Sequence, residues 1–245
     1  MKVLNDYRIL AEGDSCALIA FGGAACPETS RRISSAARRI RDAKIAGIAD
    51  MIPAYVSLLV QYDPTVLSFD VLRTRLGSIL RATEEGTDTP GRVFEIPVCY
   101  GGEFGPDLEN IASHAGMTER EVIDLHTSAE YLIYMLGFLP GFCYLGGLDE
   151  RIHTPRLQTP RLKIPAGSVG IGGSQTGIYP LESPGGWQLM GRTPVRMYDP
   201  GRETPILVQA GDSIRFTEIG AKEYERIREA VEKNEYRVTV REGGT

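Results

Sequence analysis

Apolar and polar residues along the first eighty positions follow two periods, one typical of strands and one typical of helices. Short runs of apolar and β-branched residues predict strands at residues 7–11, 17–21, 48–52 and 54–62. Apolar residues recur at the i, i+3, i+4, i+7 spacing of one helix face within residues 28–44, and again in the segment after Ser68. Gly47 stands where the C-cap of the first helix is expected, and Ser68 can cap the second helix.

This β-β-α-β-β-α order predicts an α+β fold for the N-terminal part of the chain. In such a small sandwich, helices cover one face of a mainly antiparallel sheet. The next stretch, residues 84–91, is polar and rich in turn-forming residues. We therefore expect two domains, residues 1–88 and residues 89–245.

After this stretch the pattern becomes typical of a β-barrel or a β-sandwich. Residues 93–100 predict a strand, and two short helices follow it. Thr118 and Glu121 have the spacing of a capping box at the start of the second of these helices. Residues 130–212 contain short apolar runs separated by Gly and Pro, which predict many short strands. A charged helix over residues 220–233 follows.

The composition argues against several classes of protein. The chain has 245 residues, of which 42% are hydrophobic and 24% are charged, as in ordinary globular proteins. Its formal net charge of −5 disfavours a nucleic-acid surface, because phosphate binding needs net positive potential. Four cysteines without a Cys-x-x-Cys pair and only three histidines disfavour a zinc site, so we expect no metal ligands.

The sequence shows no signal-peptide core and no run of about 18 apolar residues, the length that spans a membrane. We therefore expect a cytoplasmic protein with reduced thiols and no membrane contact.

Three segments rich in glycine and proline carry the densest signal for a binding site: residues 137–147, 165–177 and 183–192. Clustered glycines can turn consecutive backbone N–H groups toward one anion. Tight corners of a barrel need the same residues, so both interpretations stay open. The spacings of a P-loop, a Rossmann fingerprint and a nucleophile elbow are all missing from these segments.

Individual polar and aromatic residues also have two interpretations each. His126 is in step with Val122 on an apolar helix face, so it is either a core residue or a general base. Arg156 belongs to a basic group with His153 that could hold a carboxylate or phosphate, or could line an exposed loop. Trp187 could stack on a ligand or close one end of a barrel. Similarly, Arg192 could bind a substrate carboxylate or a structural one.

Long stretches of this sequence resemble one family, that of the B subunits of 5-oxoprolinase, which is also called allophanate hydrolase subunit 1 or the sporulation-kinase inhibitor family. The resemblance extends from about residue 7 to residue 219. Its motifs in the C-terminal half are residues 96–108, 137–149 and 165–194. Those in the N-terminal half are residues 53–55, 57–60 and 62–64.

The resemblance implies a small α/β N-terminal domain followed by a cyclophilin-like β-barrel. It implies a partner, the C subunit, which carries a related barrel, and a third component, the A subunit. Together these proteins catalyse the ATP-dependent opening of 5-oxoproline to glutamate, with Mg expected beside the ATP. The resemblance extends to the carboxyltransferase part of urea carboxylase, and one branch of the family instead binds and inhibits a sensor histidine kinase. A stand-alone amidohydrolase is the least favoured alternative, because the sequence lacks a metal cluster and a triad motif.

On this resemblance, opening the lactam requires N–H donors for phosphoryl oxygens and a cation for the substrate carboxylate. We expect residues 166–177 to supply the N–H donors and Arg192 or Arg156 to supply the cation. His126, predicted to be catalytic together with Arg192, is expected to move a proton. We expect the glycine-rich segments to converge on one concave face of the barrel, with His126 pointing toward it. The predicted substrate- or nucleotide-binding residues are Pro140, Gly141, Tyr144, Arg156, Ala166, Gly167, Ser168, Gly172, Gly173, Gln175, Thr176, Tyr179, Gly185, Gly186 and Trp187.

Overall fold

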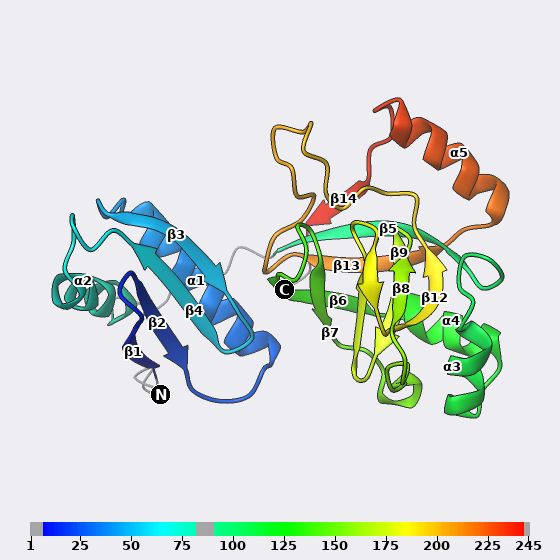
Figure 1. The fold of residues 1–245 in the computed structure, drawn as a ribbon, viewed down its shortest axis with the longest axis horizontal. Coiled ribbons are helices and arrows are strands. Elements are labelled where there is room, and N and C mark those ends of the chain that lie inside the picture. The colour runs from blue at the N-terminus through cyan, green and yellow to red at the C-terminus, as the bar shows by residue number, and fades with distance from the viewer. Residues whose placement is uncertain (1–6, 82–90, 243–245) are drawn as a thin grey trace. The chain divides into compact units, whose positions relative to one another are not determined.

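A computed structural model describes residues 7–81 and 91–242, and the chain divides into two compact units, residues 1–89 and residues 90–245 (Figure 1). The predicted boundary between residues 88 and 89 lies outside the described residues and stays a prediction. No helix in the described part of the chain is both long and apolar enough to cross a membrane.

The first unit is a four-stranded antiparallel sheet with two helices, in the strand order β1-β2-β4-β3. Alternate residues of β2 and β4, such as Ile19 and Leu58, are fully buried in one core with Ile33 of α1 and Leu72 of α2. Both helices therefore cover the same face of the sheet, as predicted. The elements are β1 (Tyr7–Glu12), β2 (Cys16–Phe21), α1 (Pro27–Asp42), β3 (Ile48–Pro53), β4 (Ser57–Tyr62) and α2 (Phe69–Arg81).

The prediction that Gly47 caps the first helix is wrong. Helix α1 ends earlier, with Ala43 as its C-cap and Lys44 in the left-handed region at φ +45°. Gly47, at φ +94°, lies directly before β3, and its carbonyl accepts a hydrogen bond from the Asp63 N–H at 2.8 Å. The glycine thus shapes the entry to a strand, where a positive φ is also needed.

The second unit is a closed β-barrel. Among the described residues, seven strands follow one another in the order β12-β9-β10-β7-β6-β13-β5, and pairing of β12 with β5 closes the ring. The α+β fold class, with a sandwich followed by a barrel, is therefore confirmed. The barrel strands are β5 (Arg92–Tyr100), β6 (Glu130–Leu136), β7 (Cys143–Gly146), β9 (Ser168–Gly172), β10 (Gln175–Ile178), β12 (Gln188–Arg192) and β13 (Ser213–Glu218).

The remaining elements of this unit surround the barrel (Figure 1). Strand β14 extends the sheet at the edge of β5, and β8 pairs with β11 in a separate two-stranded ribbon. The predicted capping box of α4 is confirmed, because the Thr118 and Glu121 side chains each accept a hydrogen bond from the other residue's backbone N–H. These elements are α3 (Leu108–Ala115), α4 (Glu119–Ser128), the 3₁₀ turn η1 (Glu150–Ile152), β8 (Arg161–Ile164), β11 (Ser183–Gly185), α5 (Ala221–Glu232) and β14 (Thr239–Glu242).

A row of polar side chains crosses the core of the barrel at His126. The imidazole has no exposed surface; its Nδ1 is 2.8 Å from the Tyr100 hydroxyl and its Nε2 is 2.8 Å from the Thr176 hydroxyl. The ring also stacks on Phe216, with 4.4 Å between the centroids. Burial lowers the pKa of His126 to about 3, so the neutral ring is the folded form.

Glycines in β9 allow neighbouring groups to approach the strand closely. A Cβ atom at Gly172 would lie 2.4 Å from Nε1 of Trp187, and one at Gly170 would lie 2.7 Å from the Gln188 carbonyl oxygen. Real Cβ atoms essentially never come this near to another heavy atom. The glycines therefore let the Trp187 indole pack directly on the barrel wall.

The buried histidine predicts a specific pH dependence of stability. Its folded pKa is depressed from 6.5, so the stabilisation is complete above pH 6.5 and is lost as the pH falls toward 3. Between pH 8 and pH 5 this one group should lower the free energy of unfolding by about 2 kcal/mol. The His126→Gln variant should lack that part of the pH dependence in denaturant titrations. An identical profile in wild type and variant would contradict the assignment, and His114→Gln, at an exposed position, is the control.

The glycine packing predicts that Gly172→Ala forces the indole of Trp187 to move. Overpacking at such a contact costs roughly 1–3 kcal/mol, measurable by denaturant unfolding. The emission of Trp187, which is the one tryptophan in the sequence, should shift at the same time. Gly220→Ala is a matched control, because nothing lies within 4 Å of its added Cβ and its φ is −82°. Unchanged emission and stability in Gly172→Ala would refute the packing argument.

Candidate functional site

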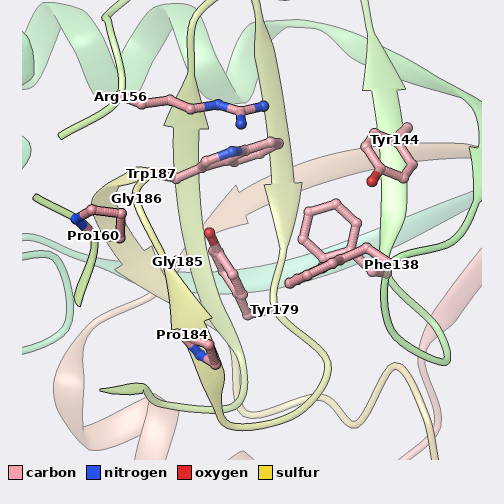
Figure 2. Close-up of a pocket in the computed structure, with 10 residues that line it drawn as sticks. Phe138, Tyr144, Arg156, Pro160, Tyr179, Pro184, Gly185, Gly186 and Trp187 are labelled. Atoms are coloured by element: carbon pink, nitrogen blue, oxygen red, sulfur yellow. The ribbon is translucent and has the colours of Figure 1, made fainter. Parts of the chain in front are cut away.

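A pocket of about 310 Å³ opens beside the β8–β11 ribbon, and Figure 2 shows its walls. The residues come from three parts of the second unit: the β6–β7 turn with β7, the segment leading into β8, and the segment from the end of β10 to β12. The residues that line it are Phe138, Phe142, Tyr144, Arg156, Pro160, Tyr179, Pro184, Gly185, Gly186 and Trp187.

Five of the ten lining residues are aromatic, and their rings are in edge-to-face contact around Phe142. The ring of Phe142 is perpendicular or steeply inclined to those of Tyr144, Tyr179 and Trp187, at centroid distances of 5.1, 5.5 and 5.6 Å. Phe142, Tyr179 and Trp187 are buried together in a small core that includes Ile164. Such contacts favour particular distances and tilts between rings, so Phe142 holds the rings of Tyr179 and Trp187 in place within this small core.

Arg156 gives the pocket its positive charge. Its guanidinium lies 5.9 Å from the centre of the Trp187 ring, and Figure 2 shows it alongside the indole. Arg156 is exposed and forms no ion pair with any residue in the described part of the chain. None of the lining residues is acidic. The guanidinium is therefore held by the indole and available to an anion.

The Tyr179 hydroxyl adds a polar group to this otherwise apolar wall. Burial raises the pKa of Tyr179, while the Trp187 backbone N–H and the positive charges of Arg156 and Arg161 oppose that increase. The phenol is therefore neutral at physiological pH. A Cβ at Gly185 would lie 2.5 Å from this hydroxyl, so the position requires glycine.

An ion pair fixes the ribbon side of the pocket to the barrel. Arg161 of β8 donates to Asp107 at 2.7 Å, and Asp107 also accepts from the Leu189 N–H at 2.6 Å. The Asp107 N–H in turn donates to the Leu189 carbonyl at 2.9 Å. Arg161 pairs across the ribbon with Gly185, a lining residue. Hence the carboxylate that anchors β8 also holds β12.

The structure brings together six of the predicted binding residues and adds four that the sequence pattern does not single out. The six are Tyr144, Arg156, Tyr179, Gly185, Gly186 and Trp187. Their role in binding stays a prediction. The four additional residues are Phe138, Phe142, Pro160 and Pro184; the two phenylalanines and Pro184 lie in segments notable for their glycines.

Residues 166–177 do not line the pocket and do not form an anion nest. They are the β9–β10 hairpin, and most of their N–H groups already have backbone partners. The Gly167 N–H donates to Tyr179, the Ser168 N–H to Pro165 and the Gly173 N–H to Thr154, at 2.7, 3.2 and 2.8 Å. The barrel-corner interpretation therefore applies to Ala166, Gly167, Ser168, Gly172, Gly173, Gln175 and Thr176.

Pro140 and Gly141 lie in the β6–β7 turn but not on the pocket wall. Gly141 has φ +82° and is buried; a Cβ there would lie 3.1 Å from that of Tyr198. Its role is to let this turn pack against the segment that contains Tyr198.

The two predicted catalytic residues are also placed elsewhere. The prediction that His126 points toward the concave face is wrong, because its ring is enclosed in the barrel core, where the depressed pKa keeps it neutral. The Arg192 guanidinium lies 6.0 Å from the Phe104 ring. Burial raises the pKa of Tyr224 of α5, and the positive charge of Arg192 opposes that increase. Phe104 and Tyr224 are themselves in contact, at 4.7 Å between centroids. Arg192 thus secures α5 to the barrel.

The residues of the pocket do not fit a magnesium nucleotide. A phosphate chain needs several free N–H donors or a lysine, and magnesium needs carboxylate oxygens, yet the lining residues supply one guanidinium. Within residues 7–81 and 91–242, no three His, Cys, Asp or Glu side chains are grouped as metal ligands. No chemical step through ATP is therefore assigned to this chain.

Comparisons with known proteins place the chain in a family. Residues 7–208 match the family described as carboxyltransferase domain, subdomain C and D. The chain is 43% identical over 233 residues to the B subunit of 5-oxoprolinase from Bacillus subtilis (strain 168), in an alignment that covers 91% of this chain and 97% of that protein.

Two solved structures have a similar fold. The crystal structure of TTHA0988 has a TM-score of 0.75 and 39% identity, over 84% of this chain and 40% of that one. The crystal structure of the K. lactis urea amidolyase has a TM-score of 0.78 and 21% identity, over 99% of this chain and 16% of that one; this likeness concerns the fold alone. The chain thus spans less than half the length of either protein.

The sequence match covers most of the chain and nearly all of a relative, and the barrel and its preceding sandwich recur in the solved structures. The chain therefore belongs to the carboxyltransferase-domain family, subdomain C and D, and within it to the family of 5-oxoprolinase B subunits.

Proposed function

We propose that this chain is the B subunit of an ATP-dependent 5-oxoprolinase, which opens 5-oxoproline to L-glutamate together with the A and C subunits. The observation that carries the proposal is the 43% identity with a relative named as the B subunit of 5-oxoprolinase, along 97% of that relative's length. A name that specifies one subunit implies a complex. All four cysteines are free thiols, which supports a cytoplasmic location for the complex.

The pocket supports a division of labour within this complex. Its walls can bind and orient a small substrate and exclude water from it. Its lining residues include no carboxylate, histidine or thiol that could serve as base or nucleophile. We therefore assign substrate binding to this chain and place ATP, its magnesium ion and the reacting groups on the partner subunits.

A second candidate function is that of one component of a urea carboxylase or allophanate hydrolase type of amide-cleaving enzyme. It is favoured by a sequence relative named urea amidolyase from Saccharomyces cerevisiae, which is 25% identical over 86% of this chain. A related protein named putative urea carboxylase is 26% identical over 74% of this chain. Both functions act on a carbon–nitrogen bond beside a carbonyl, but urea has neither the ring nor the carboxylate of 5-oxoproline.

We predict that the purified chain has negligible 5-oxoprolinase activity. Mixing it with candidate A and C subunits should restore ATP-dependent release of glutamate from 5-oxoproline, measured by a coupled glutamate assay. The control is the same mixture without this chain, which should be inactive.

Robust ATP-dependent turnover by the chain alone would overturn the proposed division of labour. An inactive mixture in which the chain instead inhibits a sensor histidine kinase would favour the inhibitor function implied by one branch of the family. Turnover of urea or allophanate in place of 5-oxoproline would favour the second candidate.

A further inference from the structure

The geometry points to the aromatic pocket as a binding site for a small planar ring that carries one carboxylate. The carboxylate would pair with the Arg156 guanidinium, and the ring would lie among the aromatic side chains of the wall. The choice of 5-oxoproline as the ligand to test rests on the proposed function. The class of ligand rests on the pocket itself.

The size of the pocket selects a small ligand. Ligand pockets generally have volumes of about 300–1,000 Å³, and this one, at about 310 Å³, is at the lower end. Prolines at positions 160 and 184 line it, and the edge-to-face aromatic contacts hold its other walls. A five- or six-membered ring with one substituent suits such a space better than a complete nucleotide.

The charge of the pocket selects an anion with one negative group. Two guanidinium groups act on the Tyr179 hydroxyl, those of Arg156 and Arg161. Arg161 is neutralised by Asp107, whereas Arg156 has no carboxylate partner among the described residues. One uncompensated positive charge remains beside the cavity. A guanidinium is a planar fork of donors that matches the two oxygens of a carboxylate.

The rings of the pocket favour a flat ligand. Figure 2 shows Arg156 and Tyr179 on opposite sides of Trp187, with Tyr144 and Phe138 facing them across the pocket. Phe138 is 62% exposed, so its ring stands at the open side of the cavity. Flat apolar surfaces on several sides fit a planar ring such as a lactam. The neutral Tyr179 hydroxyl adds one polar group in the wall for an amide or carbonyl.

The sequence provides its own probe for this site, because Trp187 is the one tryptophan in the chain. We would titrate the full chain with L-5-oxoproline and follow the tryptophan emission. The expected result is a saturable change. 2-Pyrrolidinone, which has the same ring without the carboxylate, should bind about ten- to a hundredfold more weakly, as should 5-oxoproline to Arg156→Gln.

Two further variants separate charge from geometry. Arg156→Lys keeps the charge but loses the planar fork, so its affinity should fall between those of wild type and Arg156→Gln. Arg151→Gln is the matched control, since Arg151 is exposed, lies five residues before Arg156 in the chain and is paired with Asp149. It should bind like wild type. If Arg151→Gln lost as much affinity for 5-oxoproline as Arg156→Gln, the loss would reflect the net charge of the chain and not a specific contact. That result would overturn the inference.

The assembled complex distinguishes this inference from the proposed function. In an active complex, Arg156→Gln should raise the KM for 5-oxoproline about ten- to a hundredfold, with a smaller change in kcat. An active complex with an unchanged KM would overturn the inference and leave the proposed function intact. Carboxylate-dependent binding to the chain, together with an inactive complex, would support the inference and count against the proposed function. The absence of any saturable change in emission overturns the inference.

Discussion

The contact between Trp187 and the glycine at position 172 is the constraint on which the pocket depends. A side chain at that position would overlap the indole, since an added Cβ would lie 2.4 Å from Nε1. With glycine there, the indole rests on the barrel and supports both Phe142 and the Arg156 guanidinium. The positive charge of the pocket is therefore positioned by packing, and not by an ion pair that a ligand would have to displace.

Polar groups in the barrel unit serve two separate purposes. Inside the barrel, His126 links Tyr100 and Thr176 in a neutral hydrogen-bonded row, which satisfies groups that could not otherwise be buried. Outside the barrel, the ion pair between Arg161 and Asp107 fixes the β8–β11 ribbon. Arg156, which also lies at the pocket, has no carboxylate partner among the described residues. This separation explains why the histidine, enclosed in the barrel core, is no proton donor for the pocket.

Local patterns predict the first unit well, because its core is built from regular amphipathic elements. The alternation of β2 and β4 and the helix spacing around Ile33 and Leu72 are visible in the sequence. The capping box of α4 is likewise local, since Thr118 and Glu121 are three residues apart. The position of His126 in the core also agrees with a local pattern, because His126 lies on the same helix face as the buried Val122, four residues earlier.

The site was only partly predictable, because its decisive contacts join segments far apart in the chain. Whether a glycine exposes an N–H group or admits a neighbour depends on the opposite strand, as Gly172 and Trp187 show. Similarly, nothing adjacent to Arg192 in sequence indicates Tyr224, and nothing adjacent to Arg156 indicates that its charge stays unpaired. The most direct test of this account is a crystal structure of the chain with L-5-oxoproline. We expect the ligand in the aromatic pocket with its carboxylate about 3 Å from the Arg156 guanidinium; ordered ligand beside Arg192 or elsewhere, with this pocket empty, would contradict it.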